Sequence, residues 1–170
     1  RLLLWTLASP DAALRKRAGE ILDTIAVDFD LLTHELASPM WEVREGAVRL
    51  IAKSGRLDII PLLIAEIEDY HPRVAEAARE SLSRLIDNAK LRKLRGELPP
   101  GEVNEALVIL FQTLYISKRS PRFQTIPYLF EISSLDEEAF WQMYLTLDLP
   151  QYTLLHEELL RYQKEGALRV

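Results

Sequence analysis

The chain has 170 residues, of which 48% are hydrophobic and 28% are charged, so it can bury a core and is too apolar to be disordered over most of its length. It contains no cysteine, which excludes disulfides, thiolate zinc sites and cysteine nucleophiles and fits a reducing, cytoplasmic location. The net charge of −5 argues against a dominant surface for nucleic acid or anionic membranes, because those partners select strongly basic proteins.

A sequence unit recurs three times in the first half of the chain. The run Leu7 to Arg15 returns 29 residues later as Leu36 to Arg44, and a weaker copy, Ile67 to Ala75, follows 31 residues after that. Downstream of each copy, small and aliphatic residues recur four apart, as on one face of a helix. These residues are Leu14, Ala18 and Leu22, then Val43, Ala47 and Ile51, then Val74, Ala78 and Leu82. The pattern predicts three helical hairpins, at residues 1–28, 29–57 and 58–87.

The turn inside each hairpin carries capping residues. Ser9 and Ser38 are predicted to accept hydrogen bonds from the first amides of the second helix, and Asp69 is predicted to do the same in the third unit. Pro10 and Pro39 are predicted to occupy the first turn, where a missing N–H costs nothing.

These units resemble HEAT repeats, whose short form reads Asp-Pro-x-Pro-x-Val-Arg followed by Ala and Leu at helical spacing. The resemblance rests on Pro10 and Pro39 with Arg15 and Arg44, and it weakens in the third unit, where Ala75 replaces the arginine. It implies an all-α fold, an α-solenoid of the HEAT-like or armadillo type in which antiparallel hairpins form a right-handed superhelix. It also implies a structural role for Arg15 and Arg44, each reaching an acidic group at the turn of a neighbouring repeat.

Residues 88–170 are predicted to form further helical hairpins, either degenerate repeats or a capping module. A basic helical stretch is expected over residues 88–98, with Leu91, Leu94 and Leu98 on one side, and it ends at Gly96 and the run 99–101. An apolar helix is expected over residues 103–118. Its most apolar stretch, residues 107–116, contains Gln112 and Thr113 and is too short to span a membrane, so no membrane insertion is expected. A shorter segment that Pro127 could kink follows.

Two more helices are predicted near the end of the chain. The run from Ser134 to Glu137 is typical of a capping box and predicts a helix to about Leu147. A last amphipathic helix is expected from about Gln151 to about Gly166.

Most of the aromatic residues lie in this second half. They could form a thicker core, or they could line a groove that binds a peptide through Trp and Tyr anchors. The residues concerned are Phe111, Tyr115, Phe123, Tyr128, Phe130, Phe140, Trp141, Tyr144, Tyr152 and Tyr162.

The sequence holds little that predicts catalysis. The pairs His34-Glu35 and His156-Glu157 resemble the iron ligands of HEAT-like deoxyhypusine hydroxylases, but in that family such pairs recur at equivalent repeat positions, and here they do not. No phosphate loop, metalloprotease motif or nucleophile elbow is present. We therefore expect no catalytic residue, no metal and no cofactor, with a HEAT-like metal enzyme as a remote alternative.

The leading hypothesis is a non-enzymatic interaction scaffold, because charges of both signs alternate along the second helices and suit a protein partner. The family resemblance places the binding site on the concave face, for a partner protein or another domain of the same polypeptide. The candidate contact residues are Arg17, Glu20, Glu45, Arg49, Lys53, Glu76, Arg79 and Arg84.

The alternative is a site for nucleic acid or an acidic ligand, built from the basic middle of the chain. Its candidate residues are Lys90, Arg92, Lys93, Arg95, Lys118, Arg119 and Arg122. Finally, the chain begins inside an apolar helical pattern at Arg1, which suggests a piece of a larger protein whose uncapped first hairpin could self-associate.

Overall fold

The computed structural model describes residues 2–24, 28–116 and 122–147, together with residues 153, 155–157 and 160. Over these residues the chain forms helices and no strand, so the predicted all-α fold is confirmed. None of the helices in the described part is long and apolar enough to cross a membrane. The helices are α1 (Leu2–Leu7), α2 (Ala12–Thr24), α3 (Phe29–Glu35), α4 (Trp41–Ala52), α5 (Ile60–Glu66), α6 (Pro72–Leu94), α7 (Pro100–Ile116), α8 (Arg122–Ser133) and α9 (Glu137–Leu145).

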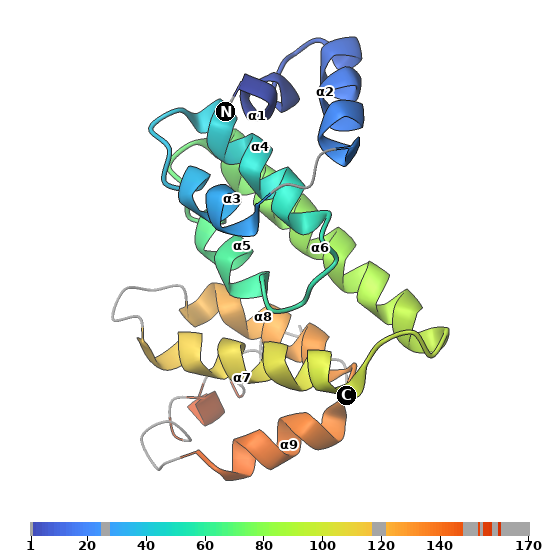
Figure 1. The fold of residues 1–170 in the computed structure, drawn as a ribbon. Helices are drawn as coiled ribbons and strands as arrows, with labels where there is room; N and C mark the ends of the chain where they lie inside the picture. Colours follow the sequence, from blue (N-terminus) through green and yellow to red (C-terminus); the bar gives the residue numbers. More distant parts are fainter. Residues whose placement is uncertain are drawn as a thin grey trace.

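The first six helices pair into hairpins in chain order. α1 packs on α2, α3 on α4, and α5 on α6, while α4 lies at the centre and packs along both α6 and α1 (Figure 1). The hairpins share one hydrophobic cluster, which continues into the second half of the chain. The helical hairpins of the first half therefore stack as the repeat pattern predicts.

The first hairpin sits differently from the other two. In the second and third hairpins the second helices, α4 and α6, lie against each other, whereas α4 meets the first hairpin mainly through α1. α2 stands off to the side, as Figure 1 shows, and Leu14 is 51% exposed although Ala18 and Leu22 are buried. Leu14 shares the helix face of these two residues but is thus not part of the core, because α4 does not cover that end of α2.

Gly46 explains how α1 approaches α4 so closely. A Cβ atom at Gly46 would lie 2.3 Å from the carbonyl oxygen of Leu4 and 2.8 Å from its carbonyl carbon. Real Cβ atoms essentially never come that near to backbone atoms. The missing side chain therefore lets the backbone of α1 rest directly on α4.

The turns are capped differently from the prediction. Asp11, directly before α2, accepts the N–H of Ala13 at 2.8 Å, while Ser9 accepts the N–H of Asp11 at 3.1 Å, outside the helix. Ser38 lies similarly ahead of α4 and receives the N–H of Met40 at 3.4 Å. Pro10 and Pro39 precede their helices by two residues and so do not occupy the first turn.

In the third unit, Asp69 accepts the N–H of His71, the residue before α6, at 2.7 Å, and Pro72 begins the helix. The serines and Asp69 thus shape the turns and do not cap the second helices.

The second helix of the third hairpin is longer than predicted. α6 runs without a break from Pro72 to Leu94, so the predicted boundary between residues 87 and 88 falls inside it. Its buried face continues past Ile86 to Ala89. The predicted helical stretch from residue 88 is thus part of α6, where Leu91 and Leu94 are 51% and 84% exposed, while Leu98, beyond the helix, packs against the core. The helix ends at Gly96, whose φ of 70° suits glycine.

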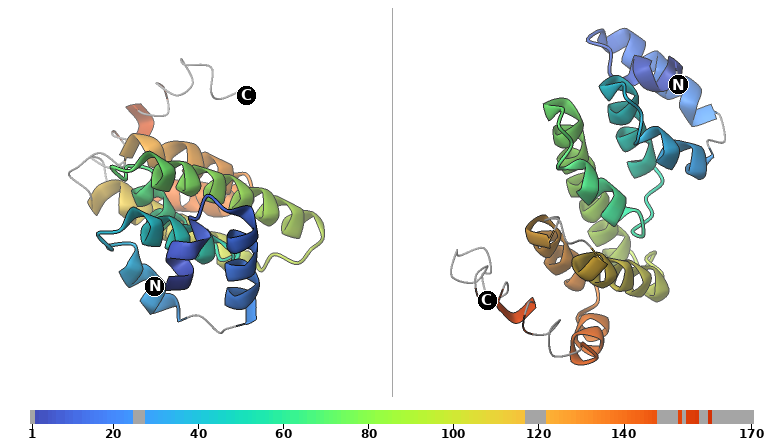
Figure 2. Two further views of the ribbon diagram at one scale, coloured as in Figure 1. Left: turned by 90° about the horizontal axis from the view of Figure 1, so that it is seen from above. Right: turned by 90° about the vertical axis from the view of Figure 1, so that its left-hand side faces the viewer.

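The second half continues the packing at the end opposite to α1 and α2 (Figure 2). α7 and α8 form a hairpin that rests on α5, and α9 packs on α7 and α8. α9 is capped by Asp136, which accepts the N–H of Ala139 at 3.0 Å, and not by Ser134, whose Oγ donates to the carbonyl of Glu131.

The aromatic residues of this half build a core. Phe140 lies at its centre, with ring centroids 5.8 Å from Phe111 and 6.1 Å from Phe130 and Tyr144. Phe111, Phe140 and Tyr144 are all buried, while Trp141 is 53% exposed at the edge. The core interpretation is therefore supported for these rings. The side chains of Tyr115, Phe123, Tyr152 and Tyr162, and most of the predicted last helix, lie outside the described residues.

Candidate partner-binding surface

Arg44 anchors the second hairpin to the third. Its Nε and Nη2 donate to the two carboxylate oxygens of Asp69 at 2.6 and 2.8 Å, and Nη1 donates to the carbonyl of Ser38 at 2.7 Å. Both charged side chains are almost fully buried. This is the contact that the family resemblance implies for Arg44, and it fixes the position of α4 relative to the turn before α6.

The surroundings of Asp69 shift three pKa values. Burial raises the pKa of Asp69, but hydrogen bonds from Arg44 and from the backbone N–H of His71 outweigh burial and leave it below its ordinary value. The hydrogen bond to Asp69 raises the pKa of Arg44. Nearby, burial and the Asp69 carboxylate raise the pKa of Glu66 to about 7, although Arg44 opposes the rise.

Arg15 occupies the position of Arg44 in the first hairpin but finds no such partner. Its Nη1 donates to the carbonyls of Ser9 and Pro10 at 2.7 and 2.9 Å, both in its own turn. Ser38 stands where the third unit has Asp69, and no described carboxylate pairs with Arg15. The predicted reach to a neighbouring repeat is therefore wrong for Arg15.

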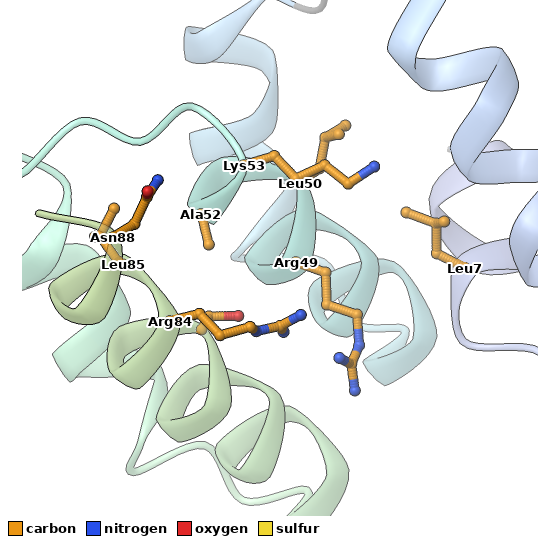
Figure 3. Close-up of a pocket in the computed structure, with 9 residues that line it drawn as sticks. Leu7, Arg49, Leu50, Ala52, Lys53, Arg84, Leu85 and Asn88 are labelled. Carbon is orange, nitrogen blue, oxygen red and sulfur yellow. The ribbon is translucent and has the colours of Figure 1, made fainter. Parts of the chain in front are cut away.

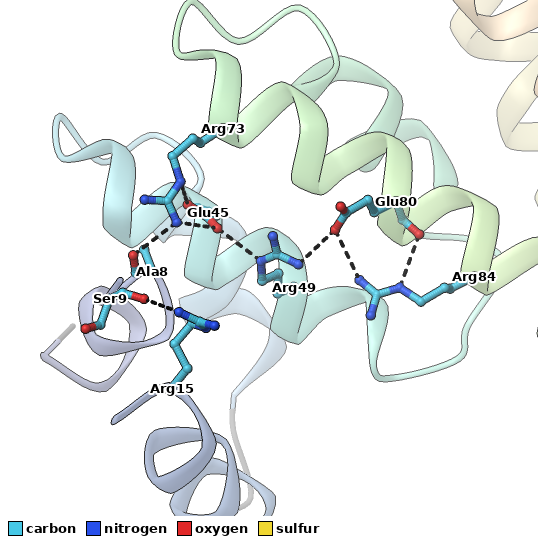
Figure 4. Close-up of polar contacts among 8 residues, drawn as sticks. All are labelled: Ala8, Ser9, Arg15, Glu45, Arg49, Arg73, Glu80 and Arg84. Atoms are coloured by element: carbon cyan, nitrogen blue, oxygen red, sulfur yellow. Dashed lines mark hydrogen bonds and ion pairs between the residues drawn. The ribbon is translucent and has the colours of Figure 1, made fainter. Parts of the chain in front are cut away.

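A row of charges crosses the face formed by α4 and α6 (Figure 4). The carboxylate of Glu45 forms ion pairs with Arg73 of α6, whose Nε lies 3.2 Å away, and with Arg49 of its own helix, whose Nε lies 3.1 Å away. Arg49 also reaches Glu80 at 3.1 Å, and Glu80 lies 4.0 Å from Arg84. Arg73 continues to the carbonyl of Ala8 at 3.1 Å and so ties the third hairpin to the first.

Glu45 is the centre of this row and is only 2% exposed. The prediction of Glu45 as a contact residue for a partner is therefore wrong. Its burial follows from α1, which covers α4 at the adjacent Gly46. Two arginines compensate the buried carboxylate, which would otherwise be costly to desolvate.

An open groove of about 300 Å³ lies beside the row of charges, between α4 and α6 (Figure 3). We call it the α4–α6 groove, and its described lining consists of Leu7, Arg49, Leu50, Ala52, Lys53, Ser81, Arg84, Leu85 and Asn88. Leu50 and Leu85 are buried at its floor, and Arg49, Lys53 and Arg84 bring positive charge to its walls. Leu7 reaches it from α1, so three helices build the site.

Apart from the buried Glu45, the predicted contact residues divide into two sets. Arg49, Lys53 and Arg84 line the groove. Arg17, Glu20, Glu76 and Arg79 do not, and they form the exposed pairs Arg17–Glu20 and Arg79–Glu76, at 3.3 and 3.2 Å. Exposed pairs three residues apart on a helix contribute little to stability.

Sequence reasoning missed the apolar and neutral polar members of the lining. The spacing of Ser81, Arg84, Leu85 and Asn88 is that of one helix face and could have indicated them. The contribution of Leu7 had no such signal, because it depends on where α1 packs.

Two of the basic residues in the middle of the chain are neutralised by carboxylates. Arg92 forms a two-pronged pair with Glu102, at 3.0 and 2.7 Å, and Lys90 pairs with Glu131. Lys93 donates to the carbonyl of Ser134 at 3.1 Å, while Arg95 is exposed beyond the end of α6. Lys118, Arg119 and the side chain of Arg122 lie outside the described residues, so their predicted convergence with this stretch stays a prediction.

The two histidine–glutamate pairs lie in different surroundings. His34 is exposed at the end of α3, where Glu35 is buried, and His156 and Glu157 are both exposed near the end of the chain. Within the part of the chain that the structure describes, no three His, Cys, Asp or Glu side chains gather in a way that could hold a metal ion.

The stacked hairpins, their shared core and the turn linked by Arg44 and Asp69 define an α-solenoid. Residues 29–108, from the start of α3 into α7, match the family model of HEAT repeats, so this part of the chain is built from HEAT repeats. The match leaves out the first hairpin, whose α2 stands apart from α4. No curated protein and no solved structure is similar enough to the chain to count as a match.

Proposed function

We propose that the chain is a non-enzymatic scaffold that holds a segment of a partner protein, or of another domain of the same polypeptide, in the α4–α6 groove. HEAT repeats commonly serve as protein-interaction scaffolds, and this groove lies on the face formed by the second helices. A cytoplasmic location, which the lack of cysteine favours, belongs to the same proposal.

The observation that carries the proposal is the make-up of the groove. An apolar floor with charged walls is typical of surfaces where a few side chains of a partner are buried and the rim stays polar. The described lining offers neither a carboxylate nor an imidazole, and its one hydroxyl, from Ser81, has no neighbouring base there. The groove is therefore better suited to binding than to acid–base catalysis.

A pair of tryptophan substitutions on α6 tests the proposal. Asn88 is exposed and lines the groove, so Asn88→Trp fills it without removing any ion pair. Ser83 is exposed on the same helix and does not line the groove, so Ser83→Trp is the matched control. Each protein serves as bait in a quantitative pull-down from cells of its source organism, after circular dichroism has shown equal helicity and equal melting temperature.

We expect a protein that is captured by the wild type and by the Ser83→Trp variant, and lost from the Asn88→Trp variant. Equal capture by all three baits would contradict the groove as the binding surface.

A further inference from the structure

The charge of the α4–α6 groove indicates what kind of segment it holds, an inference that rests on the proposed function. Its described lining contains three cationic side chains, Arg49, Lys53 and Arg84, and no anionic one. A groove lined by one sign of charge attracts the opposite sign.

Arg84 is only partly neutralised by its neighbouring carboxylate, Glu80. Glu80 is shared between two guanidinium groups, since it lies 3.1 Å from Arg49 and 4.0 Å from Arg84. The side chain of Arg84 is 67% exposed, and its Nε donates to the backbone carbonyl of Glu80 at 3.2 Å. Arg84 therefore keeps donors that can bind a further carboxylate.

Two further features of the groove restrict which segment can bind in it. Leu50 and Leu85 present aliphatic surface, which fits an apolar side chain of the occupant. Ser81 also lines the groove, and its Oγ is buried without a hydrogen-bond partner. A buried hydroxyl without a partner is costly, and a backbone carbonyl or N–H of an incoming segment would satisfy it.

We propose that the α4–α6 groove selects acidic protein segments in which Asp or Glu flanks an aliphatic side chain. The carboxylate binds Arg84, the aliphatic side chain packs on Leu50 and Leu85, and the backbone bonds to Ser81. A nucleic-acid strand would satisfy the cations as well. However, the described lining has no aromatic ring on which a base could stack, and its aliphatic floor would stay uncovered.

The test uses a display library of random peptides selected on the wild-type protein, followed by synthesis of the enriched peptides. Their affinities are measured by fluorescence anisotropy against the wild type and against two doubly neutralised variants. Lys53→Gln, Arg84→Gln removes two charges from the groove, and Arg79→Gln, Arg95→Gln removes two charges from exposed positions of the same region outside it. Arg49 is left unchanged because it compensates the buried Glu45.

We expect the enriched peptides to carry Asp or Glu beside Leu, Ile or Val. We also expect their affinity to fall at least about tenfold in the groove variant, to stay within about twofold in the control, and to weaken with salt. The Asn88→Trp variant should abolish binding of the same peptides.

Other results would overturn the inference in distinguishable ways. The library could instead enrich peptides that lack acidic residues and whose binding the Asn88→Trp variant abolishes. That result would keep the groove as a binding surface and refute its selectivity for acidic segments. Binding of a 20-nucleotide single-stranded DNA that the groove variant loses, with no acidic peptide enriched, would assign the groove to phosphates. No enrichment on the wild type would refute both the acidic selectivity and the groove as a peptide site.

Discussion

The junction between the first and second hairpins and the junction between the second and third use related sequences but different contacts. Between the second and third hairpins, α4 lies along α6, Arg44 binds Asp69 in a buried pair, and Trp41 stacks on His71 with ring centroids 4.2 Å apart. Between the first and second hairpins, α1 rests on Gly46, and Arg15 bonds only to its own turn.

This difference shows how one acidic residue sets the geometry of a repeat junction. Asp69 gives Arg44 a partner across the junction, and the two second helices are held side by side. Ser38 offers Arg15 no carboxylate, and the first hairpin instead docks through close backbone packing and through the bond from Arg73 to Ala8. Different interactions thus stabilise the two junctions, and substitutions can measure the contribution of each.

The largest effect should come from the equivalent arginines. We expect Arg44→Ala to lower the free energy of unfolding by about 3–5 kcal/mol, because it leaves the carboxylate of Asp69 buried and unpaired. Arg15→Ala removes a side chain that bonds to carbonyls at an exposed turn and should cost about 1 kcal/mol or less. Urea unfolding followed by circular dichroism measures both.

The double variant Arg44→Leu, Asp69→Leu provides a control for this comparison. It removes both charges and should lose less stability than Arg44→Ala. Equal losses for Arg44→Ala and Arg15→Ala would show that the two junctions do not differ as described.

Two glycines on second helices provide the next test. We expect Gly46→Ala to cost about 1–3 kcal/mol, because the new methyl group would overlap the backbone of Leu4. Gly19→Ala on α2 meets its nearest neighbour, the Nζ of Lys53, at an ordinary 3.9 Å. This control should stabilise α2 by about 0.5–1 kcal/mol through helix propensity.

Hydrogen exchange shows where the cost of Gly46→Ala falls. Amides of α1 should lose protection, while those of α6 should keep most of theirs. If Gly46→Ala were as harmless as Gly19→Ala, the close contact between α1 and α4 would be refuted.

The smallest expected effect is the pH dependence of the second junction. Glu66 has an ordinary pKa of 4.5 when unfolded and one of about 7 when folded, so the folded state binds the proton more tightly between these values. The free energy of unfolding should therefore fall as the pH rises from 4.5 to 7 and change no further because of this group above pH 7.

Since Glu66 is partly exposed, its contribution to this fall is about 1–2 kcal/mol. Glu66→Gln should remove that part of the fall and make the protein more stable than the wild type at pH 8. Urea midpoints at pH 5, 6, 7 and 8 measure it, with Glu68→Gln at a neighbouring exposed position as the control. A Glu66→Gln variant that loses stability with pH as steeply as the wild type would disprove the assignment.

The local sequence pattern predicted the helices well, because the buried face of a helix and the residues at which it ends depend on residues close by in the sequence. The four-residue spacing from Val43 to Ile51 marks the buried face of α4, and Pro99 and Pro100 with Gly96 mark the end of α6. The pattern misplaced the boundary at residue 88, because the buried face of α6 continues to Ala89 with small and polar residues between its apolar ones.

The candidate site was predicted only in part for a related reason. Arg49, Lys53 and Arg84 follow from the polar side of each second helix, but the groove also needs Leu7 from α1 and the buried Ser81. Glu45 lies on a charged stretch of α4 and is nevertheless buried, because α1 covers it. No spacing within α4 distinguishes a covered carboxylate from an exposed one.

The sequence by itself therefore determined the helical hairpins and their repeat, because the hydrophobic period and the turn residues are encoded locally. It also determined the arginine that joins two hairpins, because the buried charge pair is encoded at equivalent positions of the repeat. Only the tertiary structure decided that α1 and not α2 packs on α4, that Glu45 is enclosed, and that three helices form one cationic groove. Those outcomes depend on how closely two backbones approach at Gly46 and on which charges meet across a junction, and both are set by packing between segments far apart in the chain.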